Sequence, residues 1–413
     1  MMSTEFNPVF SRIKLGPIEL RNRVIKAATF EGMAIDNMVT DALIDFHKAF
    51  ATGRVGMTTL AYCAVSPDGQ GAPNEIVMRD EAVSGLRCFV DAMHDLDVAA
   101  SIQLGHAGPV GIGVGGPALS ASKVFSKTRF KNTTPADGDQ IQRIVDDFVS
   151  ASELAVKSGF DCIELHFGHG YLISNFLSPK LNKRKDDWGG CLENRARLAR
   201  TIAKRVKESI PDTVALIAKL NLDDGVKTGF HVEECVEVAK MLESDGALDA
   251  IELTGGSSFE NPMYFFRGDV PVHEMAEIFP SRIMKTGFKL TAKKFMPYYP
   301  FEEAYFLKQA RLVREAVNMP LILLGGINNL STVQLALDEG FDFVAIGRAL
   351  LREPDLVKRW EEGNDADGSC IHCNKCMPSI YQGTHCWIVP EENRPGHDKW
   401  PRQAQKVGLD DRY

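Results

Sequence analysis

The sequence has no long apolar run, no excess of positive charge and no recognisable leader pattern at its N-terminus. No stretch approaches the roughly 18 uninterrupted apolar residues of a membrane-spanning helix, so we expect no membrane span. The first residues lack the basic and then apolar order of a secretory signal peptide, which favours a cytoplasmic protein. The net charge is -8, and Lys and Arg are not clustered. Nucleic acid is therefore not the expected partner, because phosphate binding requires such clusters.

Low-complexity and disulfide-rich folds are excluded in a similar way. The 413 residues include 35 Gly and 20 Pro, close to average use, and show no internal repeat. Apolar residues make up 44% and charged residues 25%, the balance of a globular protein rather than a disordered one. In a cytoplasmic chain the nine cysteines are expected to be thiols, ligands or packing residues. Four of them lie between Cys370 and Cys386, which is not a random scatter.

The chain does contain a regular alternation of short apolar runs with amphipathic segments. The runs that predict strands are Val24–Thr29, Gly56–Tyr62, Ala99–Leu104, Cys162–His166, Ala215–Asn221, Ala250–Thr254, Leu321–Leu324 and Phe343–Ile346. The segments that predict helices include Asp41–Ala51, Ala82–Leu96, Asp139–Ser158, Glu193–Ser209, His231–Asp245, Glu303–Val317 and Leu330–Glu339. Such apolar strands are typical of parallel strands buried on both faces, and the alternation predicts a closed (β/α)8 TIM barrel. The alternative is an open doubly wound sheet. The GxGxxG turn expected after its first strand is absent.

The predicted barrel leaves two segments unassigned. We expect the barrel to occupy residues 1–360 and a Cys-containing tail to occupy residues 361–413. Residues 257–302 follow the sixth predicted strand and are rich in Tyr, Phe and Met. An insertion there emerges on the face of a barrel that carries the active site, so it predicts a lid over that site. The alternative is a docking surface for a second subunit, which would make the protein a homo-oligomer.

The end of the fourth predicted strand carries three chemically active side chains, His166, His169 and Tyr171. Reactive groups of a barrel lie at such strand ends. Two neutral imidazoles can donate hydrogen bonds to one carbonyl oxygen, and a tyrosine beside them can donate a proton. The alternatives are a metal pair or buried polar packing. Zinc usually takes a third ligand, and none is evident in this loop.

The run that starts at His166 continues to Arg195 with the pattern HxxHGYLxxxFLSPxxNxRxDxWGGxxENR. This pattern resembles the old yellow enzyme family of FMN-dependent oxidoreductases. The resemblance extends to 103–108, 325–327 and 346–350, and so through nearly the whole chain. It implies a tightly bound FMN that is reduced by NADH or NADPH. The nicotinamide would enter the substrate pocket without a Rossmann motif, so the sequence does not separate the two donors.

The resemblance places the FMN phosphate at the ends of the seventh and eighth strands. Gly325 and Gly326 end the seventh strand, and Gly347 and Arg348 end the eighth. Glycine lets backbone N–H groups approach a phosphate, and the loops after these two strands are the usual phosphate site of a barrel. Arg348 would add a charge-assisted hydrogen bond.

Three further residues are expected beside the flavin ring. Gln103 can place its amide on the ring edge, where donors and acceptors alternate. Lys219 stands where the family usually has Arg and would stabilise the anionic reduced flavin, although it lacks the planar fork of Arg. The alternative is a Lys219 on a solvated face. Many relatives have Thr or Cys near the flavin carbonyl at the position of Phe30, so the neighbouring Thr29 is the expected contact.

Cysteines in the tail follow the spacing C-x2-C-x2-C-x9-C, formed by Cys370, Cys373, Cys376 and Cys386. Thiolates at two-residue spacing are the usual ligands of an iron–sulfur cluster or of zinc. The segment resembles the cluster region of the dienoyl-CoA reductase and trimethylamine dehydrogenase branch. That branch has three residues between its second and third cysteines, a longer gap to the fourth, and further nucleotide-binding domains. A cluster, a structural zinc and a loop of free thiols stay open.

The resemblance implies a ping-pong enzyme that reduces the activated C=C bond of an α,β-unsaturated carbonyl compound, an apolar enone or a similar small molecule. His166 and His169 would hold the carbonyl oxygen, and Tyr171 would protonate the α-carbon. One alternative is a flavin-dependent N-methyl amine dehydrogenase that passes electrons through the Cys tail to a separate acceptor. The others are a flavin-free phosphosugar barrel and a redox sensor that uses its cysteines.

Overall fold

The computed structural model describes residues 7–114, 116–126, 131–258, 260–279 and 281–400, and its centre is a closed ring of parallel strands. In chain order these strands are β3 (Val24–Lys26), β4 (Met57–Ala64), β6 (Ala99–Gly105), β11 (Cys162–Phe167), β12 (Ala215–Asn221), β13 (Ala250–Thr254), β14 (Leu321–Leu324) and β15 (Phe343–Ile346). Each pairs in parallel with the next, and β15 pairs with β3 to close the ring. The short strand β5 (Ile76–Val77) adds to the edge of β4.

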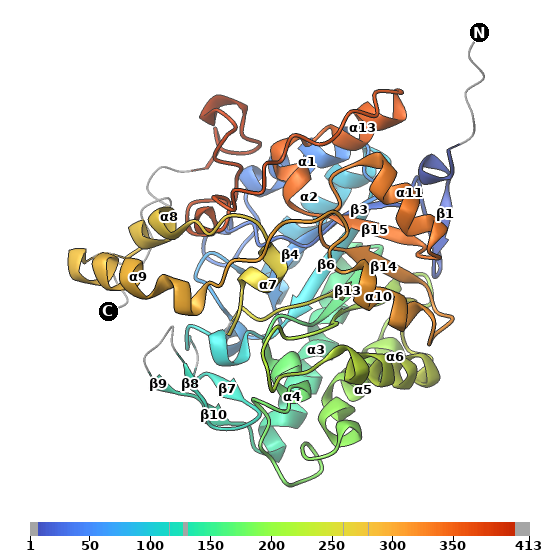
Figure 1. The fold of residues 1–413 in the computed structure, drawn as a ribbon. Helices are drawn as coiled ribbons and strands as arrows, with labels where there is room; N and C mark the ends of the chain where they lie inside the picture. The colour runs from blue at the N-terminus through green and yellow to red at the C-terminus, as the bar shows by residue number, and fades with distance from the viewer. Residues whose placement is uncertain (1–6, 115, 127–130, 259, 280, 401–413) are drawn as a thin grey trace.

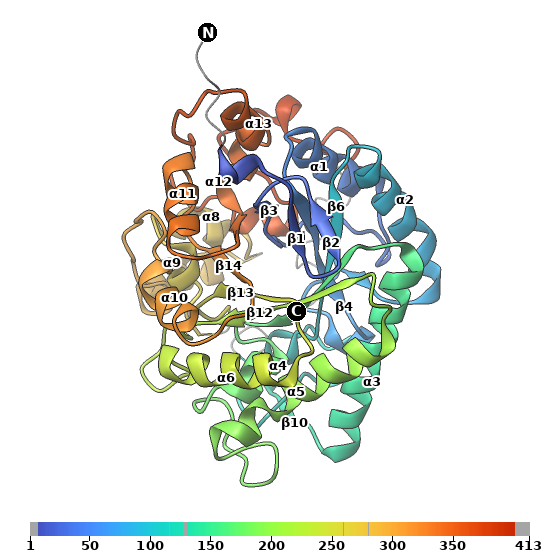
Figure 2. The same ribbon diagram turned by 90° about the vertical axis from the view of Figure 1, so that its right-hand side faces the viewer.

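Helices surround this ring, as Figures 1 and 2 show. They include α1 (Asp41–Thr52), α2 (Val83–His94), α3 (Gly138–Ser158), α5 (Leu192–Ser209), α6 (Val232–Asp245), α10 (Leu307–Arg314) and α11 (Leu330–Asp338). Local chemistry fixes several of their ends: the Thr40 hydroxyl accepts from Leu43 N at the start of α1, and Asp137 forms a capping box with Gln140 at the start of α3. The predicted (β/α)8 TIM barrel is confirmed.

Two predicted elements differ from the structure by three or more residues at a boundary. The first barrel strand ends at Lys26 rather than at Thr29, because its ladder with β15 ends where Lys26 meets Ile346. The predicted helix 303–317 begins only at Leu307. Ala304 has a φ of +48°, a left-handed conformation that interrupts a helix, and its N–H bonds to the carbonyl of Gly326. This turn brings residues 302–306 against the end of β14.

The barrel interior is closed at its N-terminal end by a hairpin. The antiparallel strands β1 (Ile13–Leu15) and β2 (Ile18–Leu20) insert Leu15 and Leu20 into an apolar cluster with residues from inside the barrel. Access to the barrel interior is therefore from the C-terminal strand ends, which we call the barrel mouth.

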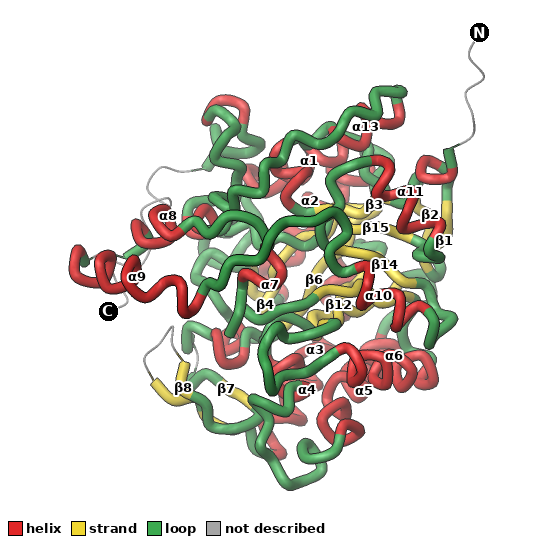
Figure 3. Tube along the Cα trace, in the orientation of Figure 1, coloured by secondary structure: helices red, strands yellow, loops and turns green. Residues whose placement is uncertain are grey.

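Segments outside the barrel lie around this mouth in Figures 1 and 3. The insertion 257–302 contains α7 (Met263–Phe266), α8 (Val272–Glu277) and α9 (Arg282–Phe295). A second insertion, which the sequence analysis did not predict, carries β7 (Leu119–Ser120), β8 (Phe125–Ser126), β9 (Lys131–Asn132) and β10 (Thr134–Pro135). After β15 come α12 (Arg348–Arg352) and α13 (Leu356–Glu361), then a tail with little regular structure. Within the described ranges, every helix is too short or too polar to cross a membrane.

Candidate active site

His166, His169 and Tyr171 come together where β11 ends and α4 (Leu172–Leu177) begins. The ring centroid of His166 lies 5.0 Å from that of His169 and 4.8 Å from that of Tyr171. His169 has a φ of +59° in the tight turn before α4, and its N–H bonds to Asn221 Oδ1 at 3.0 Å. The turn therefore faces the two imidazoles and the phenol toward one another, as the spacing predicted.

The protonation states of these groups suit donors rather than ions. Burial, with added repulsion from Lys219, lowers the pKa of His169 to about 3. Burial also holds the pKa of His166 well below its usual value. Burial raises the pKa of Tyr171, and the nearby Glu75 carboxyl raises it further. Near neutral pH, two uncharged imidazoles therefore stand beside a phenol that keeps its proton.

Thr254, at the end of β13, is a site residue that the sequence analysis did not identify. Its Oγ1 lies 2.9 Å from His169 Nε2, and its side chain is fully buried. If the hydroxyl donates, Nε2 is the acceptor and Nδ1 carries the ring proton, free to bond to a ligand. Thr254 can thus select the tautomer and fix the orientation of His169.

Aromatic side chains from three other elements enclose this group. Tyr62 on β4 lies with its ring centroid 5.3 Å from that of Tyr171, and its hydroxyl donates to the Gly69 carbonyl. Phe30 packs in the same apolar cluster as Tyr62 and Tyr171. From the insertion, Phe265 on α7 packs against His169 with a centroid distance of 4.6 Å and an angle of 34° between the ring planes. The insertion therefore contacts the histidine pair directly.

A buried charged group lies at the level of His166 inside the barrel. Lys219 on β12 places its Nζ 2.8 Å from Oε1 of Glu164 and 2.8 Å from Oε1 of Glu252. Gln103 Nε2 donates to Glu164 Oε1 at 2.6 Å. The strand register sets Lys219 between His166 and Glu252. The solvated alternative for Lys219 is wrong, since its side chain is 1% exposed.

The expected phosphate residues lie at the ends of β14 and β15. Gly325 and Gly326 have φ values of +106° and +77°, which non-glycine residues rarely adopt. A Cβ at either glycine would also collide with Tyr305. A Cβ at Gly347 would lie 3.5 Å from Thr29 Cγ2, so the predicted flavin contact Thr29 stands beside the β15 end.

The Arg348 side chain is held by the insertion and the tail. Its Nη1 donates to the Arg267 carbonyl at 2.9 Å and to Asn374 Oδ1. Asn374 Nδ2 in turn donates to the carbonyls of Arg267 and Asp269. The guanidinium of Arg348 thus joins the strand-eight end to the insertion and to the loop that carries the cysteines. Whether it also meets a phosphate stays a prediction.

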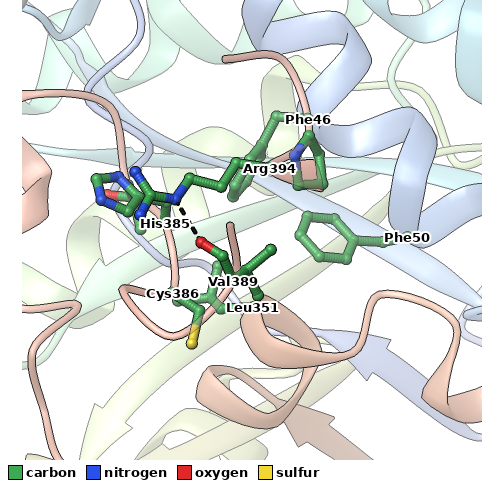
Figure 4. A pocket seen from close by; sticks show the side chains of 9 residues that line it. Phe46, Phe50, Leu351, His385, Cys386, Val389 and Arg394 are labelled. Atoms are coloured by element: carbon green, nitrogen blue, oxygen red, sulfur yellow. Dashed lines mark hydrogen bonds between the residues drawn. The ribbon is translucent and has the colours of Figure 1, made fainter. Parts of the chain in front are cut away.

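The four tail cysteines line a single cavity, together with Arg348, His372 and Trp387 among others. The pKa of Cys376 is raised to about 12, mainly because the side chain is buried. The nearby Arg348 opposes this rise, and the other three cysteines add to it. Cys386 also borders a second small cavity against Phe46 and Phe50, and Figure 4 shows its sulfur directed away from those rings. Among the described residues, no set of three or more His, Cys, Asp or Glu side chains converges closely enough to hold a metal ion.

Sequence comparison places this site in a known family. Residues 8–254 match the family model described as NADH:flavin oxidoreductase / NADH oxidase. The chain is 46% identical over 400 residues to the 4,4'-dithiodibutanoate disulfide reductase of Rhodococcus erythropolis, covering 94% of this chain and 96% of that protein. It is 30% identical over 407 residues to an NADH oxidase of Thermoanaerobacter brockii, covering 95% of this chain but 57% of that protein.

Solved structures show the same fold at lower identity. The old yellow enzyme homologue of Zymomonas mobilis matches with a TM-score of 0.69 at 21% identity, covering 96% of this chain and 99% of that one. A 2-naphthoyl-CoA reductase matches with a TM-score of 0.77 at 22% identity, and this chain spans 58% of its length. The family model covers more than half of the sequence, and the chain therefore belongs to the NADH:flavin oxidoreductase / NADH oxidase family of FMN-dependent oxidoreductases.

Proposed function

We propose that the protein uses NADH or NADPH to reduce the activated C=C bond of α,β-unsaturated carbonyl compounds. The observation that supports this most is the uncharged His166–His169 pair beside a protonated Tyr171 at the barrel mouth. Such a pair can polarise a carbonyl oxygen, and the phenol can supply a proton to carbon. The activity test is anaerobic reduction by NADH or NADPH followed by reoxidation with an enone. Failure of every enone to reoxidise the reduced protein would refute the proposal.

The residues at the barrel mouth fit an FMN. Among the described residues, the buried polar atoms without a partner include His166 Nδ1, Glu164 Oε2 and Glu252 Oε2. Gln103 and Lys219 would lie under the ring, Thr29 beside it, and the glycine pairs with Arg348 at the phosphate. Because Gln103 Nε2 is bonded to Glu164, its Oε1 is the atom left to accept from the ring edge. The flavin would supply hydride transfer, and the protein orientation and polarisation.

The protein's own groups have separate tasks in this proposal. One N–H from each histidine donates to the substrate oxygen and favours negative charge there. Tyr171 gives its proton to the α-carbon. Phe265, whose ring packs against that of His169, covers this histidine on the side of the insertion and limits access of water. Because of this contact, we propose that α7 is the part of the insertion 257–302 that acts as the predicted lid.

The outer part of the insertion suits the alternative role, contact with a second copy of the chain. On α9, Ile283 and Leu290 are 84% and 81% exposed and lie two turns apart. We therefore expect Ile283→Lys combined with Leu290→Lys to convert an oligomer into a smaller species in size-exclusion chromatography with light scattering. A mass that is monomeric before substitution would refute this role for α9.

Thr254 allows a test of the histidine pair. Thr254→Val should weaken binding of a phenol, which mimics the enone oxygen, by about 2- to 10-fold, because one hydrogen bond is worth about 0.5–1.5 kcal/mol. The measurement is a titration followed by the change in flavin absorbance. Thr254→Ser keeps the hydroxyl and should bind as the unmodified protein does. Equal weakening by both substitutions would show that Thr254 does not act through His169.

A second candidate substrate is an organic disulfide, favoured by the 46% identity to a disulfide reductase over nearly the whole length of both proteins. Two electrons and a proton convert a disulfide into a thiol and a thiolate, with no proton delivered to carbon. The two substrates should therefore respond differently to loss of the Tyr171 hydroxyl. If Tyr171→Phe slows enone and disulfide reduction equally, the distinction fails.

The tail cysteines are proposed to hold an iron–sulfur cluster, with zinc as the alternative. All four line one cavity, although no three of them lie close enough there to hold a metal ion, and thiolates at two-residue spacing are the usual ligands of a cluster. We expect iron and acid-labile sulfide in the anaerobically purified protein, and Cys376→Ser should remove most of both. Cys88→Ser, an exposed cysteine on α2, is the matched control and should retain them. Stoichiometric zinc would assign a structural role, and absence of both metals would leave a thiol loop that suits a redox sensor.

A further inference from the structure

The barrel interior holds two carboxyl groups for one lysine. Glu164 on β11 and Glu252 on β13 both lie 2.8 Å from Lys219 Nζ, and all three side chains are at most 1% exposed. Because buried charges are costly unless they are balanced, this arrangement has one negative charge too many when both carboxyls are ionised. Such an imbalance would lie at the level of His166, next to Gln103 and Lys219, the residues proposed to hold the flavin ring.

The two carboxyls are not equivalent. Glu164 Oε1 accepts hydrogen bonds from Gln103 Nε2 at 2.6 Å and from Lys219 Nζ at 2.8 Å. Glu252 has Lys219 as its partner through Oε1 alone, at 2.8 Å, and its Oε2 has no donor among the described residues. Burial raises the pKa of Glu252, and Glu164 raises it further, against the opposing effect of Lys219. Glu252 is therefore the carboxyl that more readily holds a proton.

The remaining surroundings of Glu252 do not supply the missing charge. On the β14 side its register partner is Ile322, and the cluster below it in the barrel is apolar. On the β12 and β11 side the titratable neighbours are Lys219, Glu164 and an uncharged His166. Lys26 acts on the same group from β3, but its Nζ is bonded to Thr29 and to the Ala27 carbonyl, and the carboxyl that affects its pKa most is the buried Glu31. No second cation contacts Glu252 among the described residues.

We propose that Glu252 is a positioning residue for the flavin reaction that balances charge: it takes up one proton when the flavin is reduced and releases it when the flavin is oxidised. With FMN bound, hydride transfer from the nicotinamide would leave added negative charge on the ring, which Lys219 would face. A proton from solvent then neutralises Glu252, so that Lys219 serves Glu164 and the reduced ring. The inference rests on the proposed position of FMN over Gln103 and Lys219.

The test is the flavin midpoint potential of the FMN-loaded protein as a function of pH. Removing the negative charge favours electron uptake, so Glu252→Gln should have the more positive potential at alkaline pH. A tenfold change in the ratio of reduced to oxidised flavin corresponds to about 30 mV for a two-electron couple, and we expect at least that. At acidic pH Glu252 is protonated in both redox states, and the two potentials should converge.

Two comparisons keep the test specific. Asp245→Asn removes a buried, ion-paired carboxylate from α6, outside the barrel interior, and should leave the pH dependence of the potential unchanged. In weakly buffered solution between the two pH extremes, reduction of the unmodified protein should take up more protons than reduction of Glu252→Gln. If Glu252→Gln does not fold, Glu252→Asp keeps a titratable carboxyl and should keep the pH dependence of the potential, whereas Glu252→Ala should lose it.

The outcomes separate this inference from the proposed function. A protein that never binds FMN overturns both. The second outcome is a protein that binds FMN while its potential differs from that of Glu252→Gln by the same amount at every pH. This result would support the flavin site and overturn the role of Glu252 in proton uptake. An unchanged potential at every pH overturns it as well.

Discussion

Replacing Tyr171 with Phe should slow reoxidation of the NAD(P)H-reduced protein by an enone about 10²- to 10⁴-fold, the usual range for loss of a general acid. The ring centroid of Tyr171 lies 4.8 Å from that of His166, and burial raises the pKa of the Tyr171 hydroxyl. The hydroxyl therefore keeps its proton until the substrate takes it. Reduction by NADH or NADPH requires no proton from Tyr171 and should keep its rate. Anaerobic stopped-flow absorbance measures the two half-reactions separately.

Tyr62→Phe is the matched control, because it removes the hydroxyl of another buried tyrosine. The ring centroid of Tyr62 lies 5.3 Å from that of Tyr171. The Tyr62 hydroxyl is bonded to the Gly69 carbonyl and is not the proposed proton donor. This variant should change enone reduction far less than Tyr171→Phe does. The assignment would be wrong if the two variants were equally slow, or if Tyr171→Phe lost flavin reduction and kept the rate of reoxidation.

Replacing Lys219 with Met should lower the free energy of unfolding by about 3–5 kcal/mol, because breaking a buried ion pair on one side leaves uncompensated charge. Here one lysine serves both Glu164 and Glu252, and none of the three side chains reaches solvent appreciably. Lys204→Met removes a lysine that is 46% exposed and paired with Asp245, and should cost at most about 1 kcal/mol. Urea unfolding of the two variants measures the contrast.

The loss in Lys219→Met should also depend on pH. The pKa of Glu252 is already raised by burial, and the loss of Lys219 raises it further. The folded variant then binds more protons than the unfolded chain, so its stability falls as pH rises from the unfolded carboxyl pKa of about 4.3 toward the raised folded value. Unfolding at mildly acidic pH should show a smaller deficit than at neutral pH. A loss of stability that does not depend on pH would mean that Lys219 does not balance the charge of Glu164 and Glu252.

The sequence predicted the barrel well because its strands are largely apolar, with few polar or charged residues inside them. The predicted bounds of the strands at Ala215, Ala250, Leu321 and Phe343 agree with β12 to β15. Turn geometry was harder to predict: the left-handed Ala304, an ordinary residue in the sequence, shortens the predicted helix 303–317. The strands β7 to β10 are two residues each and carry no periodic signal of their own.

The site residues also divide into those that the sequence predicted and those that it did not. His166, His169 and Tyr171 are neighbours in sequence, and a single tight turn suffices to bring them together, so their spacing predicted their meeting. Thr254 is distant in the chain and reaches His169 only through the packing of β13. Glu164 and Glu252 did carry a signal, since an acid inside an apolar buried strand requires a partner. The partner is Lys219 on β12. It meets these acids because of the register of the barrel strands, and a single sequence does not reveal that register.

The measurement that tests the central claim most directly is the absorption spectrum of the purified protein before and after anaerobic addition of NADH or NADPH, with FMN quantified after denaturation. We predict one FMN per chain, bleaching of its absorbance by one of the two nucleotides, and recovery of that absorbance when an enone is added. A colourless protein that takes up no FMN would contradict the site described for the barrel mouth.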